Sequence, residues 1–292
     1  MAGLQDIRRR IRSVKNTQQV TKAMKMISAV KLRKSQERLL ALRPYSKKMM
    51  DVTRRVVARF AGDQGLVHSP IAQAFLAPRA EEKYRLVVIA SDKGLCGGFN
   101  ANVLKQATAF VTGHPANLAY LDVVGKRAND WARKSGYTVD GAPYLGIGLT
   151  GLSQVAEEIS RSAAEQYERG EIDALYVVYN YFSSALAQVP TVLKVFPMEI
   201  EPGEPDEQGV PHLLEASPEE VLSSLLPRFI ETTFFRVLLE SSASEHGARM
   251  ASMDKASTNA EDMIARLTLN MNKIRQASIT NQIIEIVSGA NA

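Results

Sequence analysis

Residues 7–36 read IRRRIRSVKNTQQVTKAMKMISAVKLRKSQ, and this stretch contains neither glycine nor proline. Residues 4–61 as a whole contain no glycine, and Pro44 is their one proline. The apolar residues that open this segment fall three or four positions apart, at Leu4, Ile7, Ile11 and Val14. Such spacing is typical of one face of an α-helix. The sequence therefore predicts a long N-terminal helix with an apolar seam, kinked or locally disturbed at Pro44.

A second long helix is predicted at the other end of the chain. Ser217-Pro218-Glu219-Glu220 combines an N-cap serine, a proline at the first helical position and acidic residues in the first turn. From there to Val287 the only helix breakers are Pro227 and Gly247, and Gly289 is a plausible stop. The first helix leads into the middle of the chain and the last leads out, so we expect the two to lie antiparallel.

The register of this helix pair can be estimated from polar residues. If the two ends attach to the middle of the chain at equivalent places, facing residue numbers sum to about 276 at the helical rise of about 1.5 Å per residue. The polar segment Gln18–Thr21 then meets the polar segment Ser257–Asn259. The last helix should also extend past its partner, carrying residues 283–287, which are apolar on more than one face. An apolar helix end of this kind needs a sleeve supplied by another protein.

The middle of the chain alternates strand and helix patterns. YRLVVIAS (84–91), NLAYLDVVG (117–125), DALYVVYN (173–180) and QVPTVLKVF (188–196) are rich in β-branched and aromatic residues, and helical patterns lie at 99–112, 126–135 and 152–169. This alternation predicts an open, Rossmann-like α/β sheet. The fold class expected is α/β, with a long antiparallel coiled coil formed by the terminal helices. The predicted domains are the N-terminal helix 1–60, the α/β domain 61–200, an acidic Pro/Gly-rich linker 201–216 and the C-terminal helix 217–292.

Charge is distributed unevenly along the chain. Residues 1–60 contain 17 Lys and Arg against three acidic residues, a net charge of +14, whereas the remainder carries −9. A basic arm on an acidic body indicates an acidic partner, which could be nucleic acid, anionic lipid or an acidic protein surface. The arm has few aromatic residues and no DNA-reading motif, so an acidic protein surface is favoured over nucleic acid.

Composition argues against a membrane-spanning protein, a secreted protein and a metal-binding protein. The longest apolar runs, such as Leu86–Ala90, fall far short of the roughly 20 residues of a membrane-spanning helix, and the opening MAGLQDIRRR lacks the apolar core of a secretory signal. The single cysteine excludes an internal disulfide and suits a reducing compartment. The four histidines show no metal-ligand spacing. Neither a metal nor a cofactor is predicted.

The loop SDKGLCGGFN, residues 91–100, invites a catalytic interpretation because it follows a buried strand and holds the only cysteine, Cys96. It lacks the Lys-Ser/Thr of a phosphate-binding loop and the spacing of a dinucleotide fingerprint. A nucleophilic cysteine would need a base within reach, and no histidine lies in a recognisable motif. A tight turn that needs small residues is the simpler interpretation. A cysteine- or nucleotide-dependent enzyme and a basic coiled-coil binder of nucleic acid remain the alternative hypotheses.

Four strings give the chain a resemblance over its whole length. They are the opening segment 7–36, the loop SDKGLCGGFN, the segment QVPT at 188–191 and the ending KIRQASITNQIIEIVSG at 273–289. In these the chain resembles the gamma subunit of bacterial rotary ATP synthase. The resemblance implies a non-catalytic central-stalk rotor in the cavity of a hexamer of alpha and beta subunits. It also implies contacts with the epsilon subunit and the c-subunit ring, and hence an indirect, peripheral association with the cytoplasmic face of the inner membrane.

The resemblance also implies roles for individual residues. Three lie near the top of the shaft and match family positions that contact a beta subunit: Arg275, Gln276 and Thr280. Ile283 and Ile286 would turn within a hydrophobic bearing. Met24 and Lys25 match a coupling region lower down. In the loop, the residues expected to form rotor surface are Lys93, Gly94 and Cys96.

Two departures limit these assignments. Many relatives have aromatic residues before the last helix, where this chain reads VPHLLEASP at 210–218. Contacts with epsilon and the c ring are therefore not assigned to residues. The redox-regulated chloroplast forms carry an extra cysteine-bearing insert, whereas this chain has one cysteine, so switching by an internal disulfide is not available to it.

Overall fold

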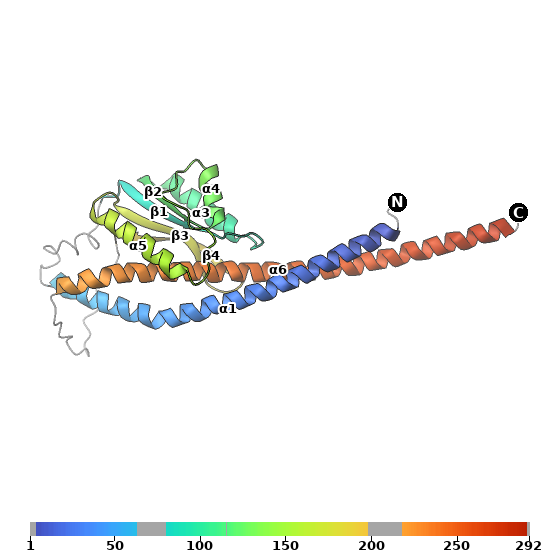
Figure 1. Ribbon diagram of the computed structural model, residues 1–292, viewed down its shortest axis with the longest axis horizontal. Helices are drawn as coiled ribbons and strands as arrows, with labels where there is room; N and C mark the ends of the chain where they lie inside the picture. The colour runs from blue at the N-terminus through green and yellow to red at the C-terminus, as the bar shows by residue number, and fades with distance from the viewer. Residues whose placement is uncertain (1–3, 63–79, 115, 198–217, 291–292) are drawn as a thin grey trace. The chain divides into compact units, whose positions relative to one another are not determined.

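The computed structural model describes residues 4–62, 80–114, 116–197 and 218–290. Two long helices enclose a central α/β region in chain order (Figure 1), which confirms the predicted fold class. The elements are α1 (Leu4–Gly62), β1 (Lys83–Ile89), α3 (Phe99–Gly113), β2 (Asn117–Val124), α4 (Lys126–Lys134), α5 (Leu152–Glu168), β3 (Ala174–Phe182), β4 (Gln188–Phe196) and α6 (Pro218–Ala290). The predicted linker 201–216 and the capping residue Ser217 lie outside the described residues.

Both long helices continue through the helix-breaking residues that they contain. Helix α1 contains Pro44, and α6 contains Pro227 and Gly247. The chain nevertheless forms two compact units: one comprises residues up to Val30 and from Arg249 onward, and the other comprises Lys31–Ala248. Each helix therefore contributes to both units.

The larger unit is built on a four-stranded sheet with strand order β2-β1-β3-β4. Strand β1 pairs in parallel with β2 and with β3, and β4 adds to β3 in the antiparallel sense. The central strand β1 is buried at every position after Lys83. Near-continuous burial of this kind is expected of a strand that helices cover on both faces.

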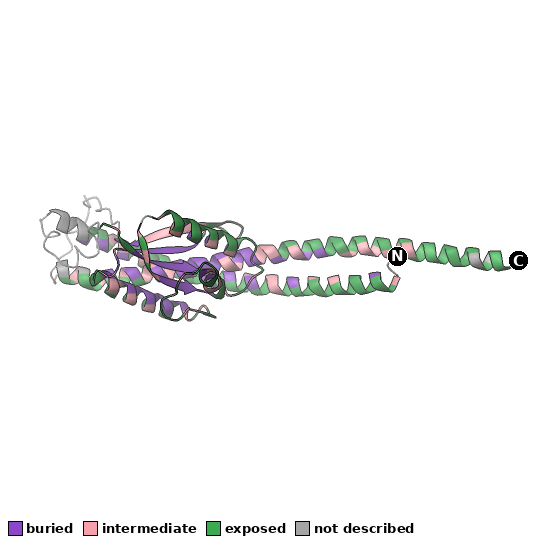
Figure 2. Cartoon of the chain, turned by 90° about the horizontal axis from the view of Figure 1, so that it is seen from above, coloured by how far each residue is buried: buried purple, intermediate pink, exposed green. Residues whose placement is uncertain are grey.

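The sheet separates two hydrophobic cores. Tyr84, Leu86 and Val88 of β1 pack with buried residues of α3 and α4. Val87 and Ile89 face the other side, where α5 and residues 226–239 of α6 cover the sheet. Buried residues consequently lie along the strands and on the helix faces that cover them (Figure 2).

A buried ion pair joins three elements beside the second of these cores. Arg85 of β1 donates two hydrogen bonds to the carboxylate of Asp122 on β2, at 2.7 and 2.9 Å. The same guanidinium donates to Ser162 Oγ and Gln166 Oε1 of α5, at 3.0 and 2.6 Å. A buried charge is tolerated when its partners are this complete. The pair thus fixes α5 against the sheet.

The smaller unit is an antiparallel pair formed by the first part of α1 and the last part of α6. It buries few large apolar side chains, and the buried residues among those described in this unit are Ile7, Thr21, Ser28, Arg249, Met253, Ser257 and Ala260. Within this unit α6 continues past the N-terminal end of α1 (Figure 1), as the sequence predicted. Across the described helices, none combines the length and the apolar character that crossing a bilayer requires.

Candidate functional site

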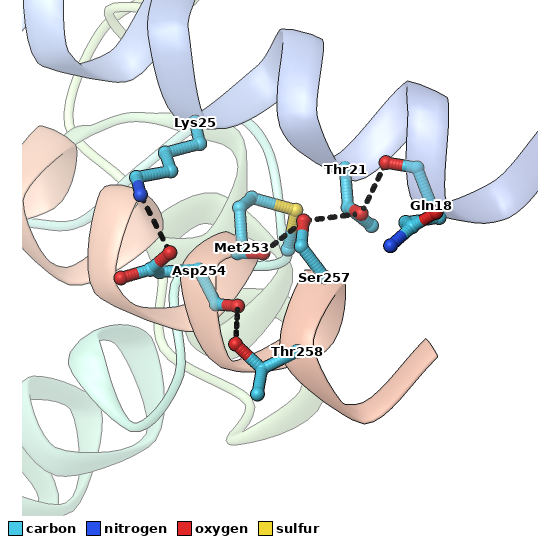
Figure 3. A network of polar contacts seen from close by, with 7 residues as sticks. All are labelled: Gln18, Thr21, Lys25, Met253, Asp254, Ser257 and Thr258. Atoms are coloured by element: carbon cyan, nitrogen blue, oxygen red, sulfur yellow. Dashed lines mark hydrogen bonds and ion pairs between the residues drawn. The ribbon is translucent and has the colours of Figure 1, made fainter. Parts of the chain in front are cut away.

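The two helices of the smaller unit are joined by a pair of polar contacts (Figure 3). Thr21 Oγ1 lies 2.7 Å from Ser257 Oγ, and this contact is buried. One turn away, Lys25 Nζ lies 2.6 Å from Asp254 Oδ1. The predicted meeting of polar segments is confirmed. The facing residue numbers sum to two or three more than the expected value of about 276, so the predicted register is confirmed to within one helical turn.

Lys25 was expected to face a surrounding subunit, but in this chain its ammonium group has a partner of its own. The side chains of Lys25 and Asp254 are 43% and 57% exposed, so the ion pair lies at the surface of the helix pair. Its neighbour Met24 is half-buried. A contact of either residue with another subunit stays a prediction.

The end of α6 presents its side chains to the surroundings. Arg275, Gln276 and Thr280 are all exposed, and Thr280 Oγ1 donates a hydrogen bond to the backbone carbonyl of Gln276 at 2.9 Å. The exposed large apolar residues of this end are Ile279, Ile283, Ile284 and Ile286. Ile283 is 56% exposed and Ile286 is 72% exposed. A cluster of exposed isoleucines on one helix end is a feature of interaction surfaces.

The loop between β1 and α3 is tied together by Ser91, Cys96 and Asn100. Ser91 Oγ donates to the Lys93 carbonyl at 2.6 Å, and the Ser91 N–H donates to Asn100 Oδ1 at 3.0 Å. Asn100 Nδ2 donates to Cys96 Sγ at 3.2 Å. The thiol is 2% exposed and packs with Phe99 and Ala248. Its polar neighbours are a hydroxyl, an amide and a carbonyl, none of which is a general base. The geometry therefore disfavours a nucleophilic role.

Neighbouring segments hold this loop in place. Asp92 accepts backbone N–H groups from Lys126 and from Gly146, each at 3.0 Å. At Gly94 a side-chain Cβ would lie 3.3 Å from the guanidinium of Arg127. Leu95 adopts a φ of 62° and is 63% exposed, so the loop displays an apolar side chain. Sequence reasoning missed Leu95; its signal was an apolar residue among the small residues of a turn.

The chain is similar over its whole length to proteins of one family. The family described as ATP synthase matches residues 3–292. The ATP synthase gamma chain of Pelotomaculum thermopropionicum is 44% identical over 292 residues, which cover 100% of this chain and 99% of that one. The gamma chain of Solibacter usitatus is 46% identical over 293 residues, with the same coverage. The chain belongs to the ATP synthase gamma chain family.

Solved structures share the fold of this gamma chain. One is a chain from the Euglena gracilis mitochondrial ATP synthase, OSCP/F1/c-ring, in rotational state 3. It has a TM-score of 0.62 at 17% identity and covers 99% of this chain and 94% of that one. A second is a chain from the central stalk and c ring of the Tetrahymena thermophila enzyme. It has a TM-score of 0.57 at 21% identity and covers 82% and 99% of the two chains.

Membership of this family identifies the chain as an ATP synthase gamma chain, one subunit of that enzyme complex. The geometry of the chain is consistent with that role, because its candidate sites are exposed helix surfaces and a packed loop. Within the described residues, no three His, Cys, Asp or Glu side chains are grouped in a way that could hold a metal ion.

Proposed function

We propose that this gamma chain couples proton flow through the membrane ring to the conformational cycle of the catalytic beta subunits. Its helix pair would occupy the cavity of the hexamer of alternating alpha and beta subunits. Its α/β domain would sit with epsilon on the ring of c subunits. The chain would therefore lie at the cytoplasmic face of the bacterial inner membrane, attached only through the ring.

Coupling follows from the asymmetry of an antiparallel helix pair. At any angle, the pair presents a different face to each of three chemically identical beta subunits. Each face favours one beta-subunit conformation and hence one affinity for ADP, phosphate or ATP. A rotor can shift such an equilibrium only by as much as its contacts differ between the conformations. Turning the shaft then drives each site through binding, synthesis and release.

The observation that carries this proposal is the exposed apolar end of α6. Ile283 and Ile286 are large, exposed and on a helix that continues past its partner, so they would turn in an apolar bearing made by the surrounding subunits. Arg275, Gln276 and Thr280 are exposed just below and would reach a beta subunit. Apolar contact without fixed ion pairs lets a shaft turn.

The basic arm supports the same arrangement. Most of its Lys and Arg residues lie on exposed positions of α1, where they would face acidic surfaces of the beta subunits. Exposed ion pairs are individually weak and exchangeable, whereas a buried, fixed pair would hold the rotor at one angle. Met24 and Lys25 would belong to this lower contact region.

The loop at Ser91–Asn100 would contribute to the rotor surface through Lys93, Gly94 and the exposed Leu95. Cys96 is buried, so it would act by packing the loop against Phe99 and Ala248. The predicted domain limits, at residues 60, 200 and 216, form part of this proposal, with the linker joining the α/β domain to the returning helix.

The test is reconstitution. The purified chain alone should hydrolyse no ATP. Combined with alpha and beta subunits, and then with epsilon and the membrane sector, it should restore ATP synthesis that a proton gradient drives. Robust hydrolysis by the chain alone would overturn the proposal. Equal gradient-driven ATP synthesis by complexes reconstituted with and without the chain would overturn it as well.

A further inference from the structure

The helix pair of the smaller unit buries few apolar side chains. Among its described residues, the buried apolar ones are Ile7, Met253 and Ala260, one of which is a methyl group. Other apolar seam residues, such as Val14 and Ile264, are half-buried. Long apolar side chains that interlock would normally fix the register of paired helices. In this helix pair, polar contacts between the helices therefore contribute more to the register.

Two polar contacts between the helices supply that definition. The Thr21–Ser257 contact is buried, and the Lys25–Asp254 ion pair lies beside it (Figure 3). We call these four residues the interhelix clamp. If α1 slid along α6 by one turn, Thr21 would separate from Ser257 and Lys25 from Asp254 at the same time. Polar contacts of this kind select one register among several that apolar packing would accept.

The hydroxyl groups of the clamp are satisfied in a specific way. Thr21 Oγ1 also lies 2.9 Å from the Gln18 carbonyl, and Ser257 Oγ lies 2.9 Å from the Met253 carbonyl. Two hydroxyl protons are available for three contacts, and each carbonyl can only accept. When one hydroxyl donates to its own helix, the other can donate across to it. A hydrogen bond between the helices is therefore available in either arrangement.

The numbers of donors and acceptors also predict the effect of removing one hydroxyl. In a Thr21→Val chain, Ser257 can still donate to the Met253 carbonyl, so no buried donor is left without a partner. The large cost of an unsatisfied buried group is then avoided. Removing the clamp should loosen the register without unfolding the helices, which makes the clamp accessible to experiment.

We propose that the interhelix clamp resists sliding of α1 along α6 and thereby stiffens the shaft against torsion. A twisted pair of helices can relieve the twist when one helix slides past the other, and slips of one turn are a known form of conformational change. Each slip would change the face that α6 presents relative to α1. The clamp makes such a slip cost both contacts at once. This inference rests on the proposed rotor function for its consequence, although the register itself does not.

The register is measured by cysteine cross-linking in the full-length chain, with Cys96→Ser as the background. The contacts of the clamp place Val14 beside Ile264, so Val14→Cys with Ile264→Cys reports the native register. Pairing Val14→Cys with Leu267→Cys or with Ala260→Cys reports a slip of one turn in either direction. In a chain with the wild-type clamp, the cross-link between positions 14 and 264 should form in the largest amount.

Two variants are then compared. Thr21→Val with Asp254→Asn removes both contacts and should raise the ratio of slipped to native cross-links by about threefold or more. Lys25→Asp with Asp254→Lys reverses the ion pair, keeps the hydroxyl contact and should give the wild-type ratio. An unchanged ratio in the first variant overturns the clamp, and so does an equal rise in both variants.

The consequence is measured in the reconstituted complex. The variant without the clamp should lose about half or more of its gradient-driven ATP synthesis while hydrolysis by the detached alpha–beta–gamma complex changes by less than about twofold. Equal synthesis by wild type and by the variant without the clamp overturns the torsional role. If the wild-type chain itself restores no synthesis, the rotor function fails, while the cross-linking ratio still decides whether the clamp sets the register.

Discussion

Gly125 shows how a single residue holds the loop region together. It follows β2 with a φ of 91°, and a Cβ at this position would lie 2.2 Å from the Ala90 carbonyl oxygen. Gly125→Ala should therefore combine a disfavoured backbone conformation with a clash against backbone, at a cost of about 3 kcal/mol. Urea unfolding of the purified chain measures this cost.

Gly136 provides the matched control for this prediction. It has a φ of 75° but nothing within 4 Å of the position of a Cβ. Gly136→Ala should cost only the conformational strain, about 1 kcal/mol. If both variants lose the same free energy of unfolding, the close approach of Ala90 to Gly125 adds nothing to the cost.

Cys96 is predicted to be dispensable for chemistry. A serine at this position can donate to the Lys93 carbonyl and accept from Asn100, so the loop keeps its partners. Cys96→Ser should lower the free energy of unfolding by about 1 kcal/mol and leave ATP synthesis close to that of the wild type. Loss of synthesis in a complex that assembles normally would restore the catalytic hypothesis.

Glu81 gives the stability of the α/β domain a dependence on pH. Burial alone would raise the pKa of this carboxyl, but hydrogen bonds from Lys194 and Tyr176, with the charges of Lys194 and His114, lower the pKa below its ordinary value of 4.5. A lowered pKa contributes stability that is present above the unfolded-state value and is lost as the pH falls through the folded-state value.

The prediction is that the unfolding free energy of the wild type falls as the pH drops below about 4.5, and that Glu81→Gln removes part of this fall. Because Glu81 lies 2.6 Å from Lys194 Nζ, the variant should also be less stable at pH 7. Urea titrations at several pH values measure both effects. Identical pH profiles for the two chains would contradict the assignment to Glu81.

At the scale of elements, helix α6 contains a glycine, Gly247, where the backbone of a loop approaches it closely. A Cβ there would lie 3.0 Å from the Ala185 carbonyl oxygen in the loop between β3 and β4. In an open helix Gly→Ala stabilises by about 1 kcal/mol. Gly247→Ala should instead lower the melting temperature, because the backbone of the loop must move away.

Gly289 tests whether this effect belongs to the contact or to the helix. It lies near the end of α6 with nothing within 4 Å of its Cβ position. Gly289→Ala should leave the melting temperature unchanged or raise it slightly. A stabilising effect of Gly247→Ala would show that the loop yields without cost.

Across the whole molecule, local patterns predicted the elements better than the contacts between them. The periodicity of residues 84–91 and the Pro-Glu-Glu start at residue 218 are local signals, and the observed β1 and α6 agree with them. The Arg85–Asp122 pair and the approach of Gly247 to Ala185 join residues far apart in sequence. No local pattern encodes these contacts. The register, which the polar segments of the two helices indicated, agrees with the structure to within one helical turn.

The last prediction concerns the assembled enzyme. Ile283 and Ile286 are exposed in the chain alone, so replacing both with Asp should leave the unfolding free energy of the free chain within about 0.5 kcal/mol of the wild type. In the complex the same change would bury two charges in an apolar bearing, at a cost of several kcal/mol. Gradient-driven ATP synthesis should then fall by about tenfold or more.

The matched control is Gln282→Asp, which adds a charge at an exposed polar position on the same end of α6. It should retain most of the synthesis, because the bearing is expected to contact the isoleucines. Synthesis and the amount of gamma chain bound to alpha and beta subunits are measured together. If the double Asp variant binds and synthesises ATP as well as Gln282→Asp does, the apolar end of α6 turns in water and the bearing is not part of the mechanism.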